Sequence, residues 1–199
     1  MTDSDAPPAL ILVDIQQGLA PEFGERNNPG AERRAAALLA AWRGAGAPVA
    51  HVQHLSVQAE SRLRPGEPGA ELHPAVRPLE GEPLFRKSVA NAFTGTGLEA
   101  HLRALDVRRV VVAGLTTEHC VSSTARVAAD LGFEVTVVED ATACFGYTGF
   151  DGRWCGPAEI HRLALVALQA EFAAIRSSAE VLAELEGRGL LGGGARAGG

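Results

Sequence analysis

The chain has 199 residues, of which 46% are hydrophobic, and this is enough for one α/β domain with a full core. The formal net charge is -6, and no block of like charges or basic amphipathic stretch occurs, which argues against a nucleic-acid or membrane-surface partner and leaves small neutral or cationic substrates open. The acidic start MTDSDAPP has no signal-peptide core, and no apolar run approaches about 18 residues, so we expect a cytoplasmic protein.

Residues 9–15, ALILVDI, predict the first strand, with Asp14 near its carboxyl end. Ligands collect outside the carboxyl ends of parallel strands, so Asp14 is a candidate site residue, and capping of the next turn is the alternative. Gln16 follows, and a Gly/Pro/Asn-rich loop to residue 30 contains Phe23, which could line a pocket mouth or simply pack. Gln16 and Phe23 are therefore candidate substrate-binding residues.

A helix over 31–44 and a strand over 48–54 are predicted next. His51 and His54 lie three apart on this strand and so point to opposite faces, which is a poor arrangement for two ligands of one metal. We expect His51 to be packed and His54, at the strand end, to face the site. The Pro/Gly-rich segment 55–83 predicts a long loop over the carboxyl edge of the sheet, typical of lids and binding loops.

The chain contains a single lysine. Lys87 lies in a short strand or turn over 84–88, and all the other basic residues among the 18 lysines and arginines are arginine. Such usage suggests a position that needs a compact, titratable ammonium group, and a residual surface lysine is the alternative.

A helix over 98–105 and a buried strand over 109–113 precede the most informative segment. Helical spacing begins again at Val121, so Cys120 falls in the first turn of a helix that follows a buried strand. Backbone N–H groups and the positive end of the helix dipole favour the thiolate there. Cys120 is therefore the candidate nucleophile.

The last third of the chain contains an aromatic-dense loop over 143–157. Aromatic residues at a reactive edge suggest substrate or subunit contact, with core packing as the alternative, and Tyr147 and Trp154 are the candidates. Around this loop the pattern predicts a strand over 134–139, a turn beginning at Asp140, a helix over 158–172, a strand over 173–176 and a helix over 178–186.

The cysteine count is odd: Cys120, Cys144 and Cys155 have no paired spacing. This favours free thiols in a reducing compartment, and a bridge between Cys144 and Cys155 is the alternative.

The alternation of strands and helices predicts an α/β fold, a three-layer α/β/α sandwich around a mostly parallel, doubly wound, Rossmann-like sheet. We expect one domain over 9–186, between a flexible N-terminus 1–8 and a Gly-rich flexible tail 187–199. The first strand and the strand at 109–113 would be neighbours at the switch point. Asp14 and Cys120 would then share one crevice.

Together, Asp14, Lys87 and Cys120 could perform acyl transfer to water. A Cys120 thiolate stabilised by Lys87 attacks a carbonyl, while Asp14 takes the thiol proton and returns it to a leaving nitrogen. Backbone N–H groups at Thr116 and Cys120 could hold the oxyanion. Such chemistry suits an amide or a related C–N bond.

The segments LILVDIQ at 10–16, FRKSVANAFTGTGL at 85–98 and VVVAGLTTEHCVSSTARVAADLGFEVTVVEDATA at 110–143 resemble the isochorismatase-like cysteine hydrolases. This superfamily includes nicotinamidases, N-carbamoylsarcosine amidases and ureido-group hydrolases. The resemblance implies that Asp14, Lys87 and Cys120 form the Asp-Lys-Cys triad of these enzymes. It also implies a cis peptide between Leu115 and Thr116 that aims the Thr116 N–H into the oxyanion hole, and a homo-oligomer, a dimer or tetramer.

The sequence differs in one feature from the nicotinamidases and in another from the isochorismatases of this superfamily. Nicotinamidases of this superfamily bind a metal through an Asp-x-His run, whereas residues 51–56 here read HVQHLS without an aspartate, so we expect neither metal nor other cofactor. Isochorismatases proper cleave a vinyl ether and lack the nucleophilic cysteine. What remains is the metal-free amidohydrolase branch, acting on a small amide, ureide or cyclic amide through a thioester. Ether hydrolysis on the same scaffold and a non-catalytic ligand-binding protein are the alternatives.

Overall fold

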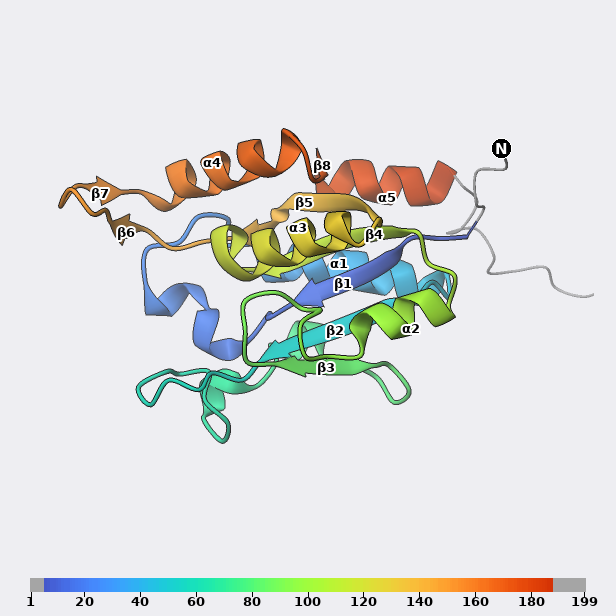
Figure 1. Ribbon diagram of the computed structural model, residues 1–199, viewed down its shortest axis with the longest axis horizontal. Coiled ribbons are helices and arrows are strands. Elements are labelled where there is room, and N and C mark those ends of the chain that lie inside the picture. Colours follow the sequence, from blue (N-terminus) through green and yellow to red (C-terminus); the bar gives the residue numbers. More distant parts are fainter. Residues whose placement is uncertain (1–5, 188–199) are drawn as a thin grey trace, which may run out of the picture.

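The computed structural model describes residues 6–187 and shows three layers, with a six-stranded sheet between two layers of helices (Figure 1). The strand order is β3-β2-β1-β4-β5-β8, and every pairing within this sheet is parallel. The strands are β1 Ala9–Val13, β2 Val49–His54, β3 Leu84–Lys87, β4 Arg109–Leu115, β5 Glu134–Ala143 and β8 Ala174–Arg176. The helices are α1 Ala31–Gly44, α2 Leu98–Ala104, α3 Ser122–Asp130, α4 Pro157–Gln169 and α5 Ser178–Gly187. The predicted α/β/α sandwich is confirmed.

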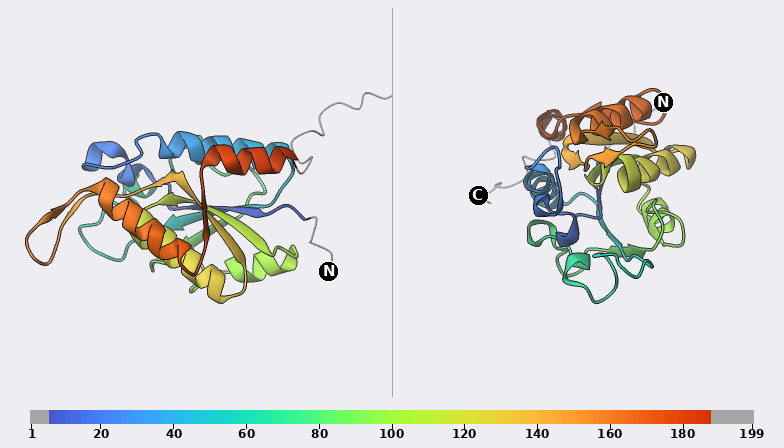
Figure 2. Two further views of the ribbon diagram at one scale, coloured as in Figure 1. Left: turned by 90° about the horizontal axis from the view of Figure 1, so that it is seen from above. Right: turned by 90° about the vertical axis from the view of Figure 1, so that its left-hand side faces the viewer.

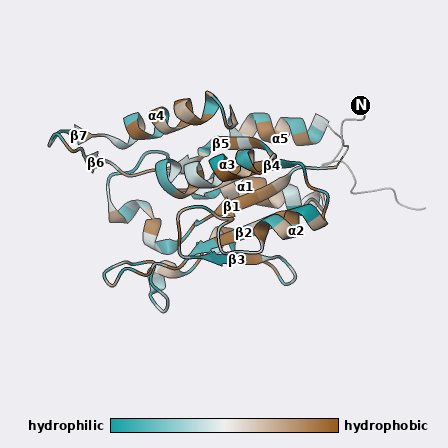
Figure 3. Ribbon diagram, viewed as in Figure 1, coloured by the Kyte–Doolittle hydropathy of each residue, from teal (hydrophilic) through white to brown (hydrophobic). Residues whose placement is uncertain are grey.

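The two faces of β1 point into two separate cores. Leu10 and Leu12 pack with α1 and α5, whereas Ile11 and Val13 pack with α2, α3 and α4. Successive side chains of a strand point to opposite faces, so a strand covered on both sides must be apolar throughout. Figure 2 shows α1 and α5 on one side of the sheet and the other helices opposite them, and in Figure 3 β1 is hydrophobic along its length.

The end of β5 differs from the prediction. Residues 140–143 were expected to form a turn, but β5 continues through them to Ala143. The reason lies in β4, which itself extends to Leu115: its register shifts between Val112 and Gly114, and Gly114 and Leu115 pair with Thr142 and Ala143. Asp140 nevertheless makes structural hydrogen bonds, since its carboxylate accepts from the backbone N–H and hydroxyl of Ser178 at the start of α5.

The aromatic loop folds into a two-stranded antiparallel hairpin, β6 Tyr147–Thr148 and β7 Trp154–Cys155. The hairpin projects from the main body at the end of the molecule to which the strands point (Figure 1). All three cysteines are free, so the alternative of a Cys144–Cys155 bridge is wrong.

Two long segments cover the carboxyl edge of the sheet. Residues 16–30 form the 3-10 turns Gln17–Leu19 and Pro21–Phe23, and residues 55–83 form Pro68–Ala70 and Pro74–Val76. Hydrogen bonds join the end of the first segment to the end of β5. Asn28 Nδ2 donates to the carbonyls of Glu139 and Thr142, and the Asn27 side chain accepts from the Cys144 N–H. Across residues 6–187, no helix is long and apolar enough to cross a membrane.

Candidate active site

The topology brings three candidate residues to one crevice. Asp14 directly follows β1, Lys87 ends β3, and Cys120 lies in a π-helical turn, Thr117–Val121, between β4 and α3. β1 and β4 are neighbours, and the chain runs from β1 to β2 and β3 on one side and from β4 to β5 on the other. This is the switch point of a doubly wound sheet, where the ends of the strands leave room for a ligand.

Lys87 Nζ lies at the centre of the site. It is 2.5 Å from Asp14 Oδ2, 3.2 Å from the carbonyl oxygen of Val89, 3.3 Å from Cys120 Sγ and 3.4 Å from His54 Nδ1. The Lys87 side chain is fully buried, with 0% exposure. A single ammonium group thus holds the carboxylate and the sulfur at hydrogen-bond distance, which explains why a compact cation is needed here.

Asp14 is a buried carboxylate with one free oxygen. Its backbone has φ 51, in the left-handed region that aspartate tolerates better than most residues. Burial raises its pKa to about 6, although Lys87 acts in the opposite direction. Oδ1 is buried and has no hydrogen-bond partner among the described residues. Asp14 is therefore an ionised group at neutral pH with a stronger affinity for a proton than an ordinary aspartate.

Cys120 differs electrostatically from the sequence-based expectation of a thiolate. Burial, followed by the negative charge of Asp14, raises the pKa of its thiol to about 12, and Lys87 offsets only part of this rise. The resting site thus holds a neutral thiol beside a charged Asp14–Lys87 pair. When Asp14 takes the thiol proton, its charge is neutralised and Lys87 faces the sulfur alone, so the thiolate forms only together with protonation of Asp14.

The peptide bond between Leu115 and Thr116 is cis, as the resemblance implies. The carbonyl of Thr116 accepts from the backbone N–H groups of His119 and Val121. Thr116 and Cys120, the predicted oxyanion-hole residues, both line the pocket to which Asp14 also contributes.

The pocket over the triad has a volume of about 420 Å³. Apolar side chains from five segments form much of its wall, and serine, glutamine and histidine side chains supply polar contacts. The larger apolar members are Leu19, Val57, Leu63, Val89, Leu115 and Phe145, and the polar ones include His54, Ser56, Gln58, Ser88 and His119. The cavity is thus suited to a small molecule with few charges.

Of the five predicted substrate-binding residues, His54 and Tyr147 line this pocket and Gln16, Phe23 and Trp154 do not. Gln16 is 1% exposed, and its side chain binds the backbone of His54 and the carbonyl of Ala70, so it joins loops instead of facing the cavity. Phe23 lies under the Arg62 guanidinium at 4.4 Å. Trp154 packs against Gly146, where an added Cβ would collide with its ring.

Glu118 is the important residue that sequence reasoning missed as a site residue. Its Oε1 accepts from the Tyr147 hydroxyl at 2.7 Å and the Thr116 hydroxyl at 3.0 Å, and lies 3.4 Å from His119 Nε2. Its position in the first helical turn was compatible with simple capping. Only the folded hairpin, which brings Tyr147 back over this turn, reveals the contact.

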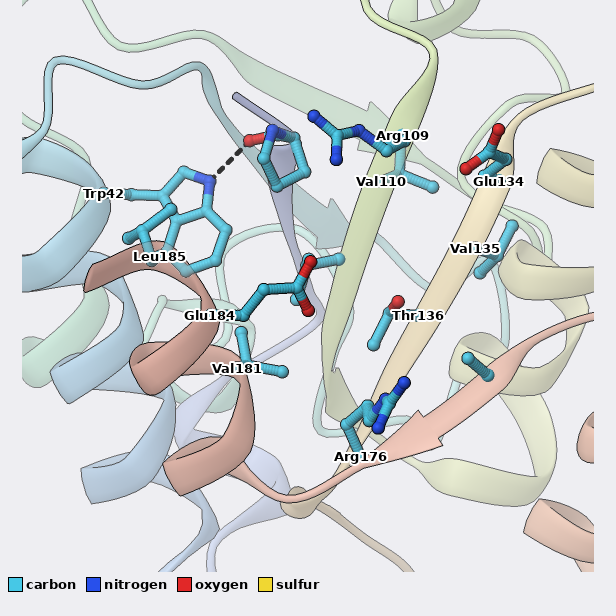
Figure 4. A pocket seen from close by; sticks show the side chains of 13 residues that line it. Trp42, Arg109, Val110, Glu134, Val135, Thr136, Arg176, Val181, Glu184 and Leu185 are labelled. Carbon is cyan, nitrogen blue, oxygen red and sulfur yellow. Dashed lines mark hydrogen bonds between the residues drawn. The ribbon is translucent and has the colours of Figure 1, made fainter. Parts of the chain in front are cut away.

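A second cavity of about 270 Å³ lies at the opposite, amino end of the sheet (Figure 4). Glu184 and Val181 of α5 face Arg176 and Thr136 across it, and Trp42 donates to the carbonyl of Pro8 at its border. Its lining includes neither cysteine nor histidine among the described residues, so the chemistry of the triad has no counterpart there. Nor do the residues 6–187 include a group of three or more side chains placed to hold a metal ion.

The protein-family model of the isochorismatase domain matches residues 8–180 of this chain. The chain belongs to the isochorismatase family. It is 37% identical over 175 residues to the isochorismatase family protein YrdC of Bacillus subtilis, covering 87% of this chain and 94% of that protein. It is 32% identical over 150 residues to the maleamate amidohydrolase of Pseudomonas putida, covering 67% and 70%. A solved isochorismatase-family structure from Chromobacterium violaceum superposes with a TM-score of 0.88 at 42% identity, covering 94% and 96%. The predicted superfamily is thereby confirmed, and isochorismatase-family proteins of this kind are hydrolases.

Proposed function

We propose that this isochorismatase-family hydrolase cleaves a C–N bond of a small amide, ureide or cyclic amide, with Cys120 as nucleophile. The observation that carries the proposal is the placement of Lys87 Nζ between Asp14 Oδ2 and Cys120 Sγ, at 2.5 Å and 3.3 Å, beneath a pocket of small-molecule size. The similarity to a maleamate amidohydrolase supports amide hydrolysis as the reaction class.

In the first half of the reaction, Asp14 accepts the Cys120 thiol proton as Sγ attacks the carbonyl carbon. The C–S bond forms, and the carbonyl π electrons move onto oxygen, where the backbone N–H groups of Thr116 and Cys120 stabilise the negative charge. The oxyanion then collapses, the C–N bond breaks, and Asp14 gives its proton to the departing nitrogen. A thioester on Cys120 and free ammonia or an amine result.

In the second half, Asp14 acts as base again and takes a proton from water, whose oxygen attacks the thioester carbonyl. Collapse of the second oxyanion breaks the C–S bond and releases the acid, and the sulfur regains a proton. Throughout, Lys87 remains a fixed positive charge that faces whichever of Asp14 and Cys120 is the anion. A proton acceptor with a pKa near 6 suits both halves, because it must take and return a proton at neutral pH.

The test is an ammonia-release screen over primary amides, ureides and lactams, with the Cys120→Ala protein as the blank. Cys120→Ser, which replaces the thiol with a hydroxyl of similar size, serves as a second variant. We expect release by the wild type and a loss of at least about a thousandfold in both variants, because the residual chemistry lacks a nucleophile of comparable strength. Unchanged turnover in Cys120→Ala would overturn the proposal.

A further inference from the structure

The charges around the active-site pocket are one-sided. No arginine or lysine is found among the described residues that line it. Lys87 lies just beneath, but its ammonium group is already committed to Asp14. Arg26, which hydrogen-bonds to the carbonyl of the pocket residue Leu19, has its charge paired with Glu32 through two bonds of 2.7 and 2.8 Å, and its side chain is 0% exposed. A substrate carboxylate would thus find no free cation in this wall.

Glu118 places a negative charge directly behind the wall. Three pocket residues, Thr116, His119 and Tyr147, contact its Oε1, and Glu118 is 14% exposed at its side chain. Its other oxygen, Oε2, is buried without a hydrogen-bond partner among residues 6–187. No arginine or lysine is paired with it in the described chain. The charge is therefore screened less than that of a carboxylate in bulk water.

Tyr147 and His119 extend this region to the surface, since both line the pocket and are partly exposed. Their rings meet edge to face with centroids 6.0 Å apart, and Tyr147 donates its hydroxyl hydrogen to Glu118. The phenol oxygen keeps its lone pairs for a donor on the ligand, and the ring offers a face to a cation. Donor groups and positive charge are what this wall can accept.

We propose that the pocket selects amides whose non-reacting end is neutral or positively charged, preferring an ammonium group near Tyr147 and Glu118, and rejects amides that carry a carboxylate. This inference rests on the proposed function and narrows its substrate class. The preferred substrates of this chain would then differ from the substrate of the maleamate amidohydrolase to which it is similar, because maleamate carries a carboxylate.

The first experiment reads the pocket charge without requiring turnover. Cys120 is reacted at pH 8 with two methanethiosulfonates of similar size, one bearing a trimethylammonium group and one bearing a sulfonate, and labelling is followed by peptide mass analysis. In either reaction the Cys120 sulfur forms an S–S bond to the reagent's thioethyl group and methanesulfinate leaves. The partly exposed Cys155 is the internal reference. We expect the cationic reagent to react at Cys120 at least about tenfold faster after this normalisation.

Two matched variants test whether the charge of Glu118 causes that preference for the cationic reagent. Glu118→Gln retains the acceptor oxygen for Tyr147 and Thr116 but removes the charge, so the cation-to-anion rate ratio should fall by about fivefold or more. Glu159→Gln removes one exposed carboxylate from α4, and its ratio should stay at the wild-type value. An unfolded fraction would also lose the preference, so the comparison uses Glu118→Gln protein whose circular dichroism spectrum and urea midpoint match those of the wild type. Equal or anion-favoured labelling of wild-type Cys120, or an unchanged ratio in Glu118→Gln, would overturn the inference.

The second experiment uses amides of similar length: 4-aminobutanamide, pentanamide and succinamate. We expect kcat/KM to fall in that order, with at least about a tenfold difference between the first and the last. Turnover that depends on Cys120 but favours succinamate would refute the inference while leaving the proposed function standing. If none of these amides and none of the amides, ureides and lactams of the ammonia-release screen is turned over above the Cys120→Ala blank, the proposed function fails, and the labelling ratio alone decides the charge preference of the pocket.

Discussion

At the scale of single residues, Asp14 determines the pH dependence of the reaction. The carboxylate must be ionised to take the thiol proton, and burial raises its pKa from the ordinary 3.8 to about 6. Activity should therefore be lost as the pH falls through this higher value, and kcat/KM should rise tenfold per pH unit below about pH 6 before it levels off. Initial rates between pH 4 and 8 on a neutral amide check this. If the acidic limb of the pH–rate profile lay near pH 4, where an unburied aspartate titrates, the assignment of buried Asp14 as the proton acceptor would be contradicted.

Lys87 provides the second prediction at this scale. Lys87→Arg keeps the positive charge, yet the four acceptors and donors that surround Nζ leave no space for a planar guanidinium. We expect kcat/KM to fall by at least about a hundredfold, because a displacement of roughly 1 Å at a reacting group costs that much. Arg86→Lys, on the exposed position before it, is the matched control and should retain the wild-type rate. Near-normal activity of Lys87→Arg would show that only charge is required.

At the scale of elements, Glu82 fixes the end of the long segment 55–83. Its carboxylate accepts two bonds of 2.7 Å from Arg43 of α1, one from the Leu79 N–H, and lies 2.9 Å from Nε2 of the buried His51. These bonds, those of Arg43 first, lower its pKa to about 2 from 4.5. A carboxyl whose pKa is lower in the folded state stabilises the fold above pH 4.5, and this contribution is lost as the pH falls towards 2.

Glu82→Gln should therefore lower the free energy of unfolding at pH 7 by roughly 2 to 3 kcal/mol, because a shift of about 2.5 pKa units corresponds to about 3.4 kcal/mol and solvent screening of this partly exposed carboxylate reduces that energy. The difference from the wild type should shrink to less than half at pH 3. Urea unfolding at both pH values measures it, and Glu80→Gln, an exposed glutamate of the same segment, is the control. An equal loss at pH 7 and pH 3 would mean that packing, and not charge, dominates.

The elements also show what the sequence could and could not predict. Apolar runs such as Ala9–Val13 are buried on both faces, so their composition alone predicted the parallel sheet and the crevice that joins Asp14 and Cys120. The extension of β5 was missed because it depends on a register shift in β4, which residues 140–143 do not encode locally. Gln16 was misassigned and Glu118 overlooked for the same reason: their partners, Ala70 and Tyr147, lie 54 and 29 positions away in the chain.

At the scale of the whole molecule, the same burial that prepares the site opposes folding. The Asp14 and Lys87 side chains are 1% and 0% exposed, at the carboxyl ends of β1 and β3. Because the pKa of Asp14 is higher in the folded state, the folded chain binds its proton more tightly than the unfolded chain does. The stability from this group is therefore greatest below pH 3.8 and falls as the pH rises through about 6, by on the order of 3 kcal/mol. The active site is thus maintained by the hydrophobic packing around it.

The destabilising effect of burying this charged pair can be measured with Asp14→Asn, Lys87→Met and the double variant. Each single change leaves one buried charge without its partner and should lower the free energy of unfolding at pH 7 by roughly 3 kcal/mol, whereas replacing a buried pair altogether is often neutral or stabilising. Asparagine also tolerates the left-handed backbone of position 14. We expect the double variant to be inactive and at least as stable as the wild type in urea at pH 7, with a coupling energy of about 6 kcal/mol or more, because the two single losses of about 3 kcal/mol are both absent. A double variant less stable than either single one would show that the Asp14–Lys87 pair stabilises the fold, and that catalysis here carries no cost in stability.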